Sequence, residues 1–222
     1  GGPCDINSTV ESYMALRLAG ISKGRPEMIQ AREAIFANGG IKATRVFTKV
    51  FLAMFGQISW SVCPSVPVEI ILLKNWFPLN IYEMSSWSRG TVVPLSIVIS
   101  HKPVCHLPEG NDFKELFNSG DSELGFESDG LVFSSWRNFF INLDKLLKLI
   151  GKSPWKPFRK IARKRALSWV IEHQEEQGDF SGIQPAMLNS LLAYHYEGIS
   201  KNDPKWVKGL EAVERFLINK KE

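Results

Sequence analysis

The chain has 222 residues, of which 44% are hydrophobic and 23% charged, and its formal net charge is +4. This composition is that of an ordinary globular protein, so it excludes a disordered chain, a collagen-like repeat and a multispan membrane protein. The length fits one large domain or two small ones, with enough residues to bury a sizeable core.

Apolar residues recur at helical spacing along most of the chain, and glycine, asparagine and proline separate the runs. Ser8 and Glu11 fit a capping box, which predicts that the first helix opens at Ser8 and stops at Gly20. The next helix is expected to begin at Pro26 and to end at Asn38. Further helices are expected at 46–56, 84–100, 132–150, 158–174, 185–196 and 204–218, around an irregular stretch at 57–81.

A short pattern, Gly-Ile-Ser-Lys-x-x-Pro, begins at Gly20 and recurs at Gly198. In each copy a glycine ends one helix and a proline opens the next, so each copy predicts a helical hairpin. Stacked hairpins build helical arrays, and a ring of them is an α/α toroid whose inner helices enclose a cavity. The sequence therefore predicts an all-α fold, an incomplete α/α barrel of helical hairpins. The alternative is that shared cap chemistry produces similar turns without a duplicated unit.

Cysteine and histidine are sparse. The three cysteines lie far apart, which fits a reducing compartment better than a disulfide scaffold. His101, Cys105 and His106 form the one tight group, and it lacks an evident fourth ligand, so no metal site is expected. The uncharged stretch 50–68 contains prolines and serines that disfavour a membrane-spanning helix.

Charge is segregated into two neighbouring segments. Residues 109–130 hold seven acidic residues and one lysine, and we expect residues 101–130 to form a polar acidic loop. Residues 137–165 hold ten basic residues and one acidic residue, a net charge of +9. The modest overall charge therefore hides a strongly basic segment.

Residues 132–160 are predicted to contact a membrane. Large apolar side chains at helical spacing form a stripe that lysines flank or follow, which suits an anionic membrane surface. The alternative is a helix packed inside the toroid with a solvated basic face. No nucleic-acid-binding signature accompanies the basic residues, so nucleic acid is not expected as a partner. The residues that carry this prediction are Trp136, Phe139, Phe140, Leu143, Leu147, Lys152 and Lys156.

Residues 165–180 contain the pattern Arg-Ala-x2-Trp-x4-Gln-x3-Gly-x-Phe. This pattern resembles the QW repeat of the squalene–hopene and oxidosqualene cyclases, in which a glutamine ends one helix and an aromatic residue stacks near the next. The family normally has tryptophan where this chain has Phe180. Other stretches look like bacterial squalene–hopene cyclases in the same order and with similar gaps: GGPCD (1–5), RVFT (45–48), NIYEMSSWSR (80–89), TVV (91–93) and GIQP (182–185).

The resemblance implies that residues 1–222 are part of one α/α-barrel domain of a triterpene cyclase. Such an enzyme cyclises squalene to hopene or a hopanol by a carbocation cascade, which an aspartic acid of a DxDD motif starts by protonating an alkene. This chain has no DxDD motif, so the segment alone is expected to be inactive, and no metal or organic cofactor is implied. The expected partners are squalene or a related polyprene, the remainder of the cyclase chain and a membrane. The implied location is the cytoplasmic face of a membrane, as a peripheral, monotopic protein.

The resemblance also implies site residues. Trp87 matches an aromatic residue that faces the cavity, where its ring would stabilise cations. Ile183, Gln184 and Pro185 match a strip near the end of the cavity, where an amide can hold water, and Pro185 also fits a helix start. The remaining matches are Arg45 and Phe51 close to that polar end, and Met84 and Val92 on the substrate channel, where a spacing of eight suggests one helical face.

Two other classes of function stay open at this point. One is a non-catalytic α/α-toroid module that binds lipid or another protein. The other is a different toroid enzyme, either a protein prenyltransferase subunit, which needs a zinc ligand set that is not evident, or a glycosidase, which needs paired carboxylates in a cleft. A DxDD motif and further QW repeats elsewhere in the gene would decide for the cyclase.

Overall fold

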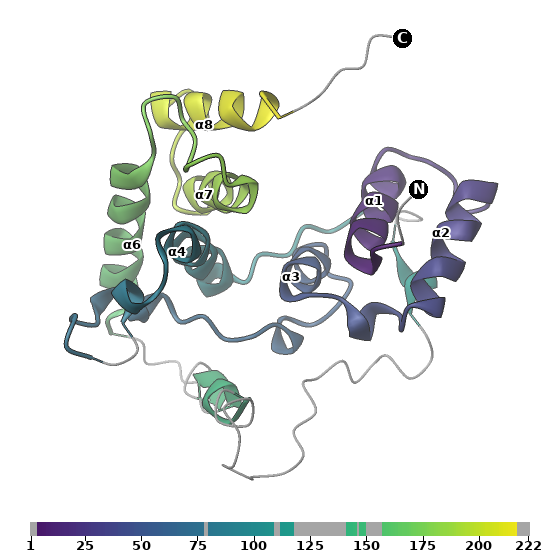
Figure 1. Cartoon of the computed structure of the whole chain (residues 1–222), viewed down its shortest axis with the longest axis horizontal. Coiled ribbons are helices and arrows are strands. Elements are labelled where there is room, and N and C mark those ends of the chain that lie inside the picture. The colour runs from purple at the N-terminus through teal and green to yellow at the C-terminus, as the bar shows by residue number, and fades with distance from the viewer. Residues whose placement is uncertain are drawn as a thin grey trace. The chain divides into compact units, whose positions relative to one another are not determined.

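The computed structural model describes residues 4–77, 80–108, 112–117, 141–145, 147–149 and 157–216. These residues form α-helices, short 3-10 turns and irregular connections, and no strand lies among them (Figure 1), which confirms the all-α prediction. Residues 141–145 and 147–149 are helical, within the range expected for the helix at 132–150. The seven longer helices are α1 (Ile6–Leu18), α2 (Pro26–Ala37), α3 (Val46–Met54), α4 (Ser86–His101), α6 (Arg159–His173), α7 (Gln184–Tyr196) and α8 (Pro204–Glu214).

The start of α1 differs from the prediction. Asp5 is the N-cap, and its Oδ1 accepts a hydrogen bond from the Ser8 backbone N–H at 2.9 Å. Ser8 therefore lies inside the helix, and the capping box at Ser8 and Glu11 was wrong. Asp5 takes the place that the prediction gave to Ser8, because aspartate and serine are equally good N-caps.

The described residues fall into two compact units. Unit 1 comprises Gly1–Pro64 and Pro103–Lys148, and it contains α1, α2 and α3. Unit 2 comprises Ser65–Lys102 and Leu149–Glu222, and it contains α4, α6, α7 and α8. The prediction that residues 1–222 belong to one barrel domain stays a prediction.

The core of unit 1 includes residues from the predicted acidic loop. Phe113 and Leu116 are fully buried with the apolar faces of α1 and α2. Between them in sequence, Glu115 accepts a hydrogen bond at 2.8 Å from the Tyr13 hydroxyl, and its Oε1 lies 3.4 Å from Arg17 Nε. Burial and this carboxylate raise the pKa of Tyr13 to about 12. The segment 112–117 is thus an anchored part of unit 1, and residues 118–130 lie outside the described residues.

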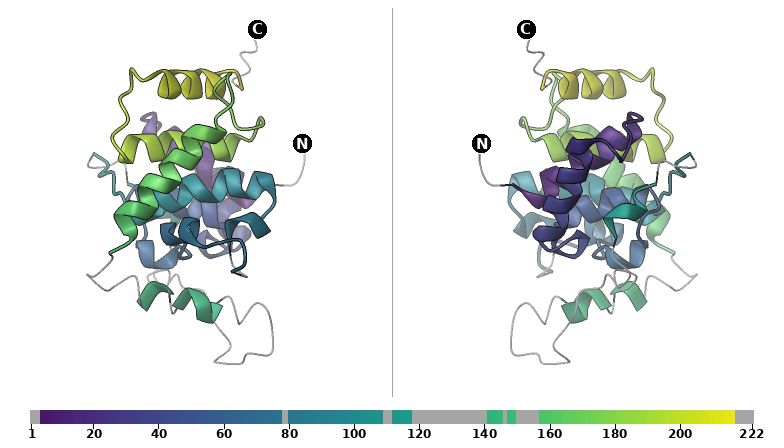
Figure 2. Two further views of the ribbon diagram at one scale, coloured as in Figure 1. Left: turned by 90° about the vertical axis from the view of Figure 1, so that its left-hand side faces the viewer. Right: turned by 90° about the vertical axis from the view of Figure 1, so that its right-hand side faces the viewer.

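Unit 2 is built around α4 and α7, which lie alongside each other (Figures 1 and 2). Near their starts the Asn189 side chain donates to the Thr91 carbonyl at 3.3 Å. At their ends, His101 Nε2 lies 2.7 Å from Glu197 Oε1. The two helices therefore run in the same direction, as equivalent helices of successive hairpins do in a helical array.

The repeated sequence pattern forms the same turn in both units. Gly20 and Gly198 have φ of 84° and 79°, a left-handed conformation that glycine adopts without strain. In both copies the next residue, Ile21 or Ile199, donates its backbone N–H to a carbonyl five residues back. The hairpin prediction is therefore confirmed at the level of the turn. The packing differs, because Ala15 of α1 is exposed whereas its counterpart, Ala193 of α7, is fully buried in the core that α4 shares.

Candidate functional site

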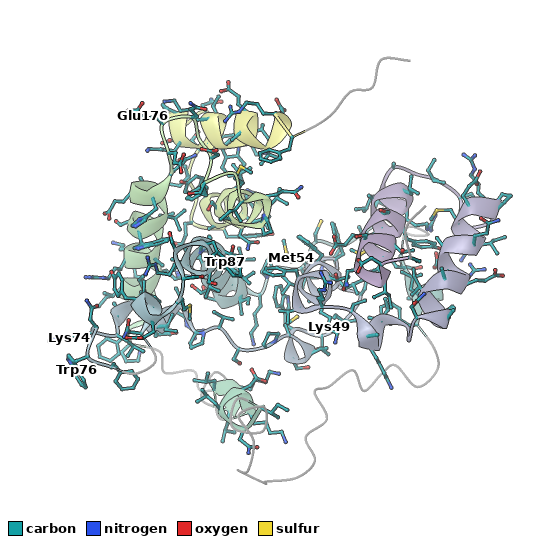
Figure 3. All side chains as sticks on the ribbon, viewed as in Figure 1. Lys49, Met54, Lys74, Trp76, Trp87 and Glu176 are labelled. Atoms are coloured by element: carbon teal, nitrogen blue, oxygen red, sulfur yellow. The ribbon has the colours of Figure 1, made fainter. Side chains whose placement is uncertain are left out.

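The start of α4 carries the aromatic residue that the sequence assigned to a cavity. Trp87 is the second residue of α4, and 64% of its surface is exposed (Figure 3). Gln184 and Pro185 are the first two residues of α7, and both are exposed. Because α4 and α7 run in the same direction, Trp87 and the strip that includes Ile183, Gln184 and Pro185 lie at the same end of the helix pair. The structure thus places four residues from two separate sequence motifs at one end of the same helix pair.

Local hydrogen bonds explain why residues 80–89 present Trp87. Asn80 is buried, and its Oδ1 accepts from the Tyr82 backbone N–H at 2.7 Å while its Nδ2 donates to the Phe77 carbonyl at 2.7 Å. Arg89 Nη1 donates to the Met84 carbonyl at 3.3 Å, which ties the first turn of α4 to the segment before it. These side chains fix the direction in which α4 starts.

The turn before α7 is held by its own contacts. Glu175 Oε1 accepts from both the backbone N–H and the hydroxyl of Ser181 at 3.1 Å. Ser181 and Gly182 have φ of 54° and 67°, so two successive left-handed residues turn the chain into the helix. The sequence reasoning missed Glu175 and Asn80, although a polar residue beside a turn is a general signal for such capping bonds.

Gln174 of the QW-type motif uses its whole side-chain amide to join three elements. Its Nε2 donates to the carbonyls of Gly178 and Lys205, at 3.0 and 2.9 Å, and its Oε1 accepts from the Tyr194 hydroxyl at 3.0 Å. Burial raises the pKa of Tyr194, which keeps that hydroxyl protonated as a donor. Phe180 is buried in the unit 2 core at the position where the family pattern has tryptophan. This junction links the end of α6 to α7 and to the start of α8.

Arg45 and Phe51 belong to unit 1, so their predicted proximity to Gln184 stays a prediction. Arg45 is the N-cap of α3, and its exposed guanidinium lies 3.8 Å from an Asp5 carboxylate oxygen. Phe51 is half-buried against the unit 1 core. The role that the resemblance gave to each residue is untested by these contacts.

The prediction that Met84 and Val92 lie on one helical face was wrong. Met84 lies before α4, as the C-cap of the 3-10 turn Ile81–Glu83, whereas Val92 lies inside the helix. Both side chains are half-buried. Their assignment to a substrate channel therefore depends on the resemblance alone and stays a prediction.

Most of the predicted membrane residues lie outside the described residues: Trp136, Phe139, Phe140, Lys152 and Lys156. Leu143 and Leu147 are helical and half-buried, and Leu149 is exposed. None of the described helices combines the length and hydropathy that crossing a bilayer requires.

The candidate metal group is dispersed in the structure. His101 is the last residue of α4 and contacts Glu197, whereas Cys105 and His106 are exposed in the connection that follows the helix. Across the part of the chain that the structure describes, no three histidine, cysteine, aspartate or glutamate side chains gather as metal ligands.

The hairpins α1–α2 and α7–α8 share one type of turn, and the all-helical architecture of the described residues is consistent with the α/α-toroid class of protein. The whole sequence, residues 1–222, matches the family model described as the squalene-hopene cyclase N-terminal domain. The chain belongs to the squalene–hopene cyclase family, as the resemblance implied. Nothing in the comparisons favours the non-catalytic alternative.

Curated relatives match nearly all of this chain, but the chain is only a part of each of them. It is 39% identical to the squalene–hopene cyclase of Alicyclobacillus acidocaldarius over 220 residues, which are 98% of this chain and 34% of that protein. It is 35% identical to the squalene–hopene cyclase of Zymomonas mobilis over 218 residues, 98% of this chain and 33% of that protein. The enfumafungin synthase of Hormonema carpetanum is 39% identical over 97% of this chain, which spans 17% of that longer protein.

Proposed function

We propose that this chain is the N-terminal part of a squalene–hopene cyclase that converts squalene to hopene or a hopanol. The observation that carries the proposal is the family match over the whole chain. The position of Trp87 at the same end of the α4–α7 pair as Ile183, Gln184 and Pro185 supports it, because the two stretches that carry the resemblance lie on one side of unit 2. The partners in this proposal are a polyprenyl substrate and the remainder of the cyclase chain.

The chemistry of this reaction makes clear demands on the wall of a cavity. A carbocation cascade needs electron-rich faces that stabilise successive cations, and it needs water to be excluded until the last cation forms. In the proposal, Trp87 supplies such a face, and its exposure in this part of the protein leaves its ring free to line a cavity. The Gln184 amide holds the water that accepts the final proton or adds to the last cation, with Ile183 and Pro185 beside it in sequence.

The proposal predicts that this segment alone is inactive and that its parent is active. No DxDD motif lies in residues 1–222, so the segment lacks the acid that starts the cascade. Purified parent protein, incubated with squalene and analysed by gas chromatography and mass spectrometry, should yield a pentacyclic product, whereas the purified segment should yield none. Cyclised product from the segment would show that the acid has been misplaced, and an inactive, folded parent would refute the proposed function.

We also propose that the parent docks on the cytoplasmic face of a membrane, where squalene dissolves. At the start of α6, Phe158 and Ile161 are exposed apolar side chains, and Lys160 and Lys164 beside them are exposed cations. Phe158 and Lys160 belong to the predicted segment 132–160, and Ile161 and Lys164 follow it. Their mixed apolar and basic surface suits anionic headgroups. Each basic residue near such a surface contributes about 1 kcal/mol.

This location predicts a specific order of effects on vesicle binding. In a sedimentation assay with vesicles that contain phosphatidylserine, Phe158→Ser with Ile161→Ser should weaken binding by the parent more than Lys160→Gln with Lys164→Gln. The apolar contribution is insensitive to salt, whereas the charge attraction is screened beyond ~8 Å at physiological ionic strength. Val207→Ser with Leu210→Ser, a second exposed apolar pair on α8, is the matched control and should leave binding unchanged. Equal losses from the two apolar pairs would argue against a docking surface at α6.

A further inference from the structure

Small residues line the face of α7 that packs on α4. The face is marked by Asn189, which bonds to Thr91 of α4, and by Ala186, which is the nearest side chain to the Gly90 position. Helical spacing adds Ser190 and Ala193 to it, and all four α7 residues are buried. Small side chains let two helices approach closely, but they form shallow ridges and therefore oppose axial sliding weakly.

A polar cluster joins the opposite, C-terminal ends of the same two helices. His101 is the last residue of α4 and Glu197 is the C-cap of α7, and their Nε2 and Oε1 atoms are 2.7 Å apart. Arg163 of α6 places its Nε 3.3 Å from the same Glu197 oxygen and its Nη1 3.3 Å from His101 Nε2. The side chains of His101, Glu197 and Arg163 are 24%, 12% and 28% exposed, so the contacts are partly shielded from water.

The polar contacts at the C-terminal ends act together with the Asn189–Thr91 hydrogen bond near the starts of the helices, and directional contacts of this kind are well suited to setting register. The helix α4 is continuous from Ser86 to His101, with Pro94 inside it, so it transmits an axial displacement along its length. A slip of one residue amounts to about 1.5 Å. A shift at His101 would therefore reach Trp87 at the other end of the helix.

We propose that His101, Glu197 and Arg163 form a register clamp that positions Trp87 relative to Gln184. This inference rests on the proposed function, because its consequence is the placement of an aromatic face against a passing cation. The three residues act through α4 and α7 and are positioning residues. Their loss should alter which products the cascade releases, because a displacement of this size strongly affects the reacting geometry.

The test compares clamp variants with a matched ion pair in the full-length parent. Glu197→Gln and His101→Ala should raise the ratio of incompletely cyclised to pentacyclic product about tenfold, with KM for squalene little changed. His101→Gln, which keeps a side-chain N–H donor toward Glu197, should restore most of the normal ratio. The control is Glu69→Gln, which removes the ion pair between Arg159 and Glu69 that ties α6 to residues 68–72. This pair has a similar length, 2.9 Å, and its side chains have a similar exposure, 24% and 30%.

Two results would overturn the proposal. One is that Glu69→Gln shifts the product ratio as much as Glu197→Gln does, and the other is that no clamp variant shifts it.

A second measurement does not depend on catalysis. Spin labels are attached at Ser86→Cys and Gln184→Cys, in a background in which exposed native cysteines are replaced. The two labels lie on neighbouring helix starts about 10 Å apart, and dipolar broadening detects a separation of this size. Glu197→Gln should change this broadening and Glu69→Gln should not. An unchanged spectrum refutes the clamp, whereas a changed spectrum, together with no cyclised product from the unlabelled parent that retains Gln184, refutes the proposed function alone.

Discussion

Replacing Gly178 with alanine should destabilise unit 2 more than the same replacement at any other glycine that the structure describes in this unit. A Cβ at this position would lie 2.1 Å from the Lys208 carbonyl oxygen and 2.3 Å from its carbon, both of them backbone atoms that cannot turn aside. The residue also has φ of 91°, which alanine adopts only with strain. We expect a loss of about 4 kcal/mol in the free energy of unfolding, measured by urea denaturation of the parent.

The matched control for this experiment is Gly182→Ala. Gly182 also has a positive φ, 67°, but no atom lies within 4 Å of the point that an alanine Cβ would occupy there. Its substitution should therefore cost only the backbone strain, about 1 kcal/mol. Equal losses from the two substitutions would show that α8 does not approach the turn at Gly178 as closely as described.

Replacing Trp87 with alanine in the parent should change which products form, rather than simply weaken substrate binding. A desolvated cation over an indole face is stabilised by about 2 kcal/mol, which corresponds to a shift of roughly thirtyfold between competing outcomes. We therefore expect early-quenched products to rise at the expense of pentacyclic product, as measured by gas chromatography and mass spectrometry. Trp87→Phe, which keeps an aromatic face, should retain most of the pentacyclic product.

Trp76 provides the control for Trp87 because it is a second exposed tryptophan of unit 2, away from the start of α4 (Figure 3). Trp76→Ala should leave the product spectrum unchanged. If Trp87→Ala leaves the spectrum unchanged as well, or if both substitutions alter it alike, Trp87 has no specific role in stabilising a cation.

Sequence patterns were sufficient for the helices because local chemistry determines where they end. Gly20 and Pro26 punctuate the first hairpin as predicted, and Gly198 and Pro204 punctuate its repeat in the same way. The starts of α1 and α4 are exceptions, because Asp5 caps α1 in place of Ser8 and Met84 lies before α4.

The parts of the site that escaped prediction depend on residues far apart in the chain. Motifs predicted Trp87 and Gln184 separately, but their position at one end of unit 2 follows from the parallel packing of α4 and α7. The pair of His101 and Glu197 joins residues 96 positions apart, and no local pattern marks the two as partners. Glu115 was similarly assigned to a solvated loop because its partner, Tyr13, is 102 residues away.

An experimental structure of the full-length parent with a bound, uncyclisable polyene would test the central claim most directly. The account predicts that the polyene lies against the starts of α4 and α7, with the Trp87 ring within about 4.5 Å of the chain. It also predicts that the Gln184 side chain lies at the end of the same cavity. A polyene bound elsewhere, with Trp87 covered by packed protein side chains, would contradict the assignment of this segment to the wall of the active site.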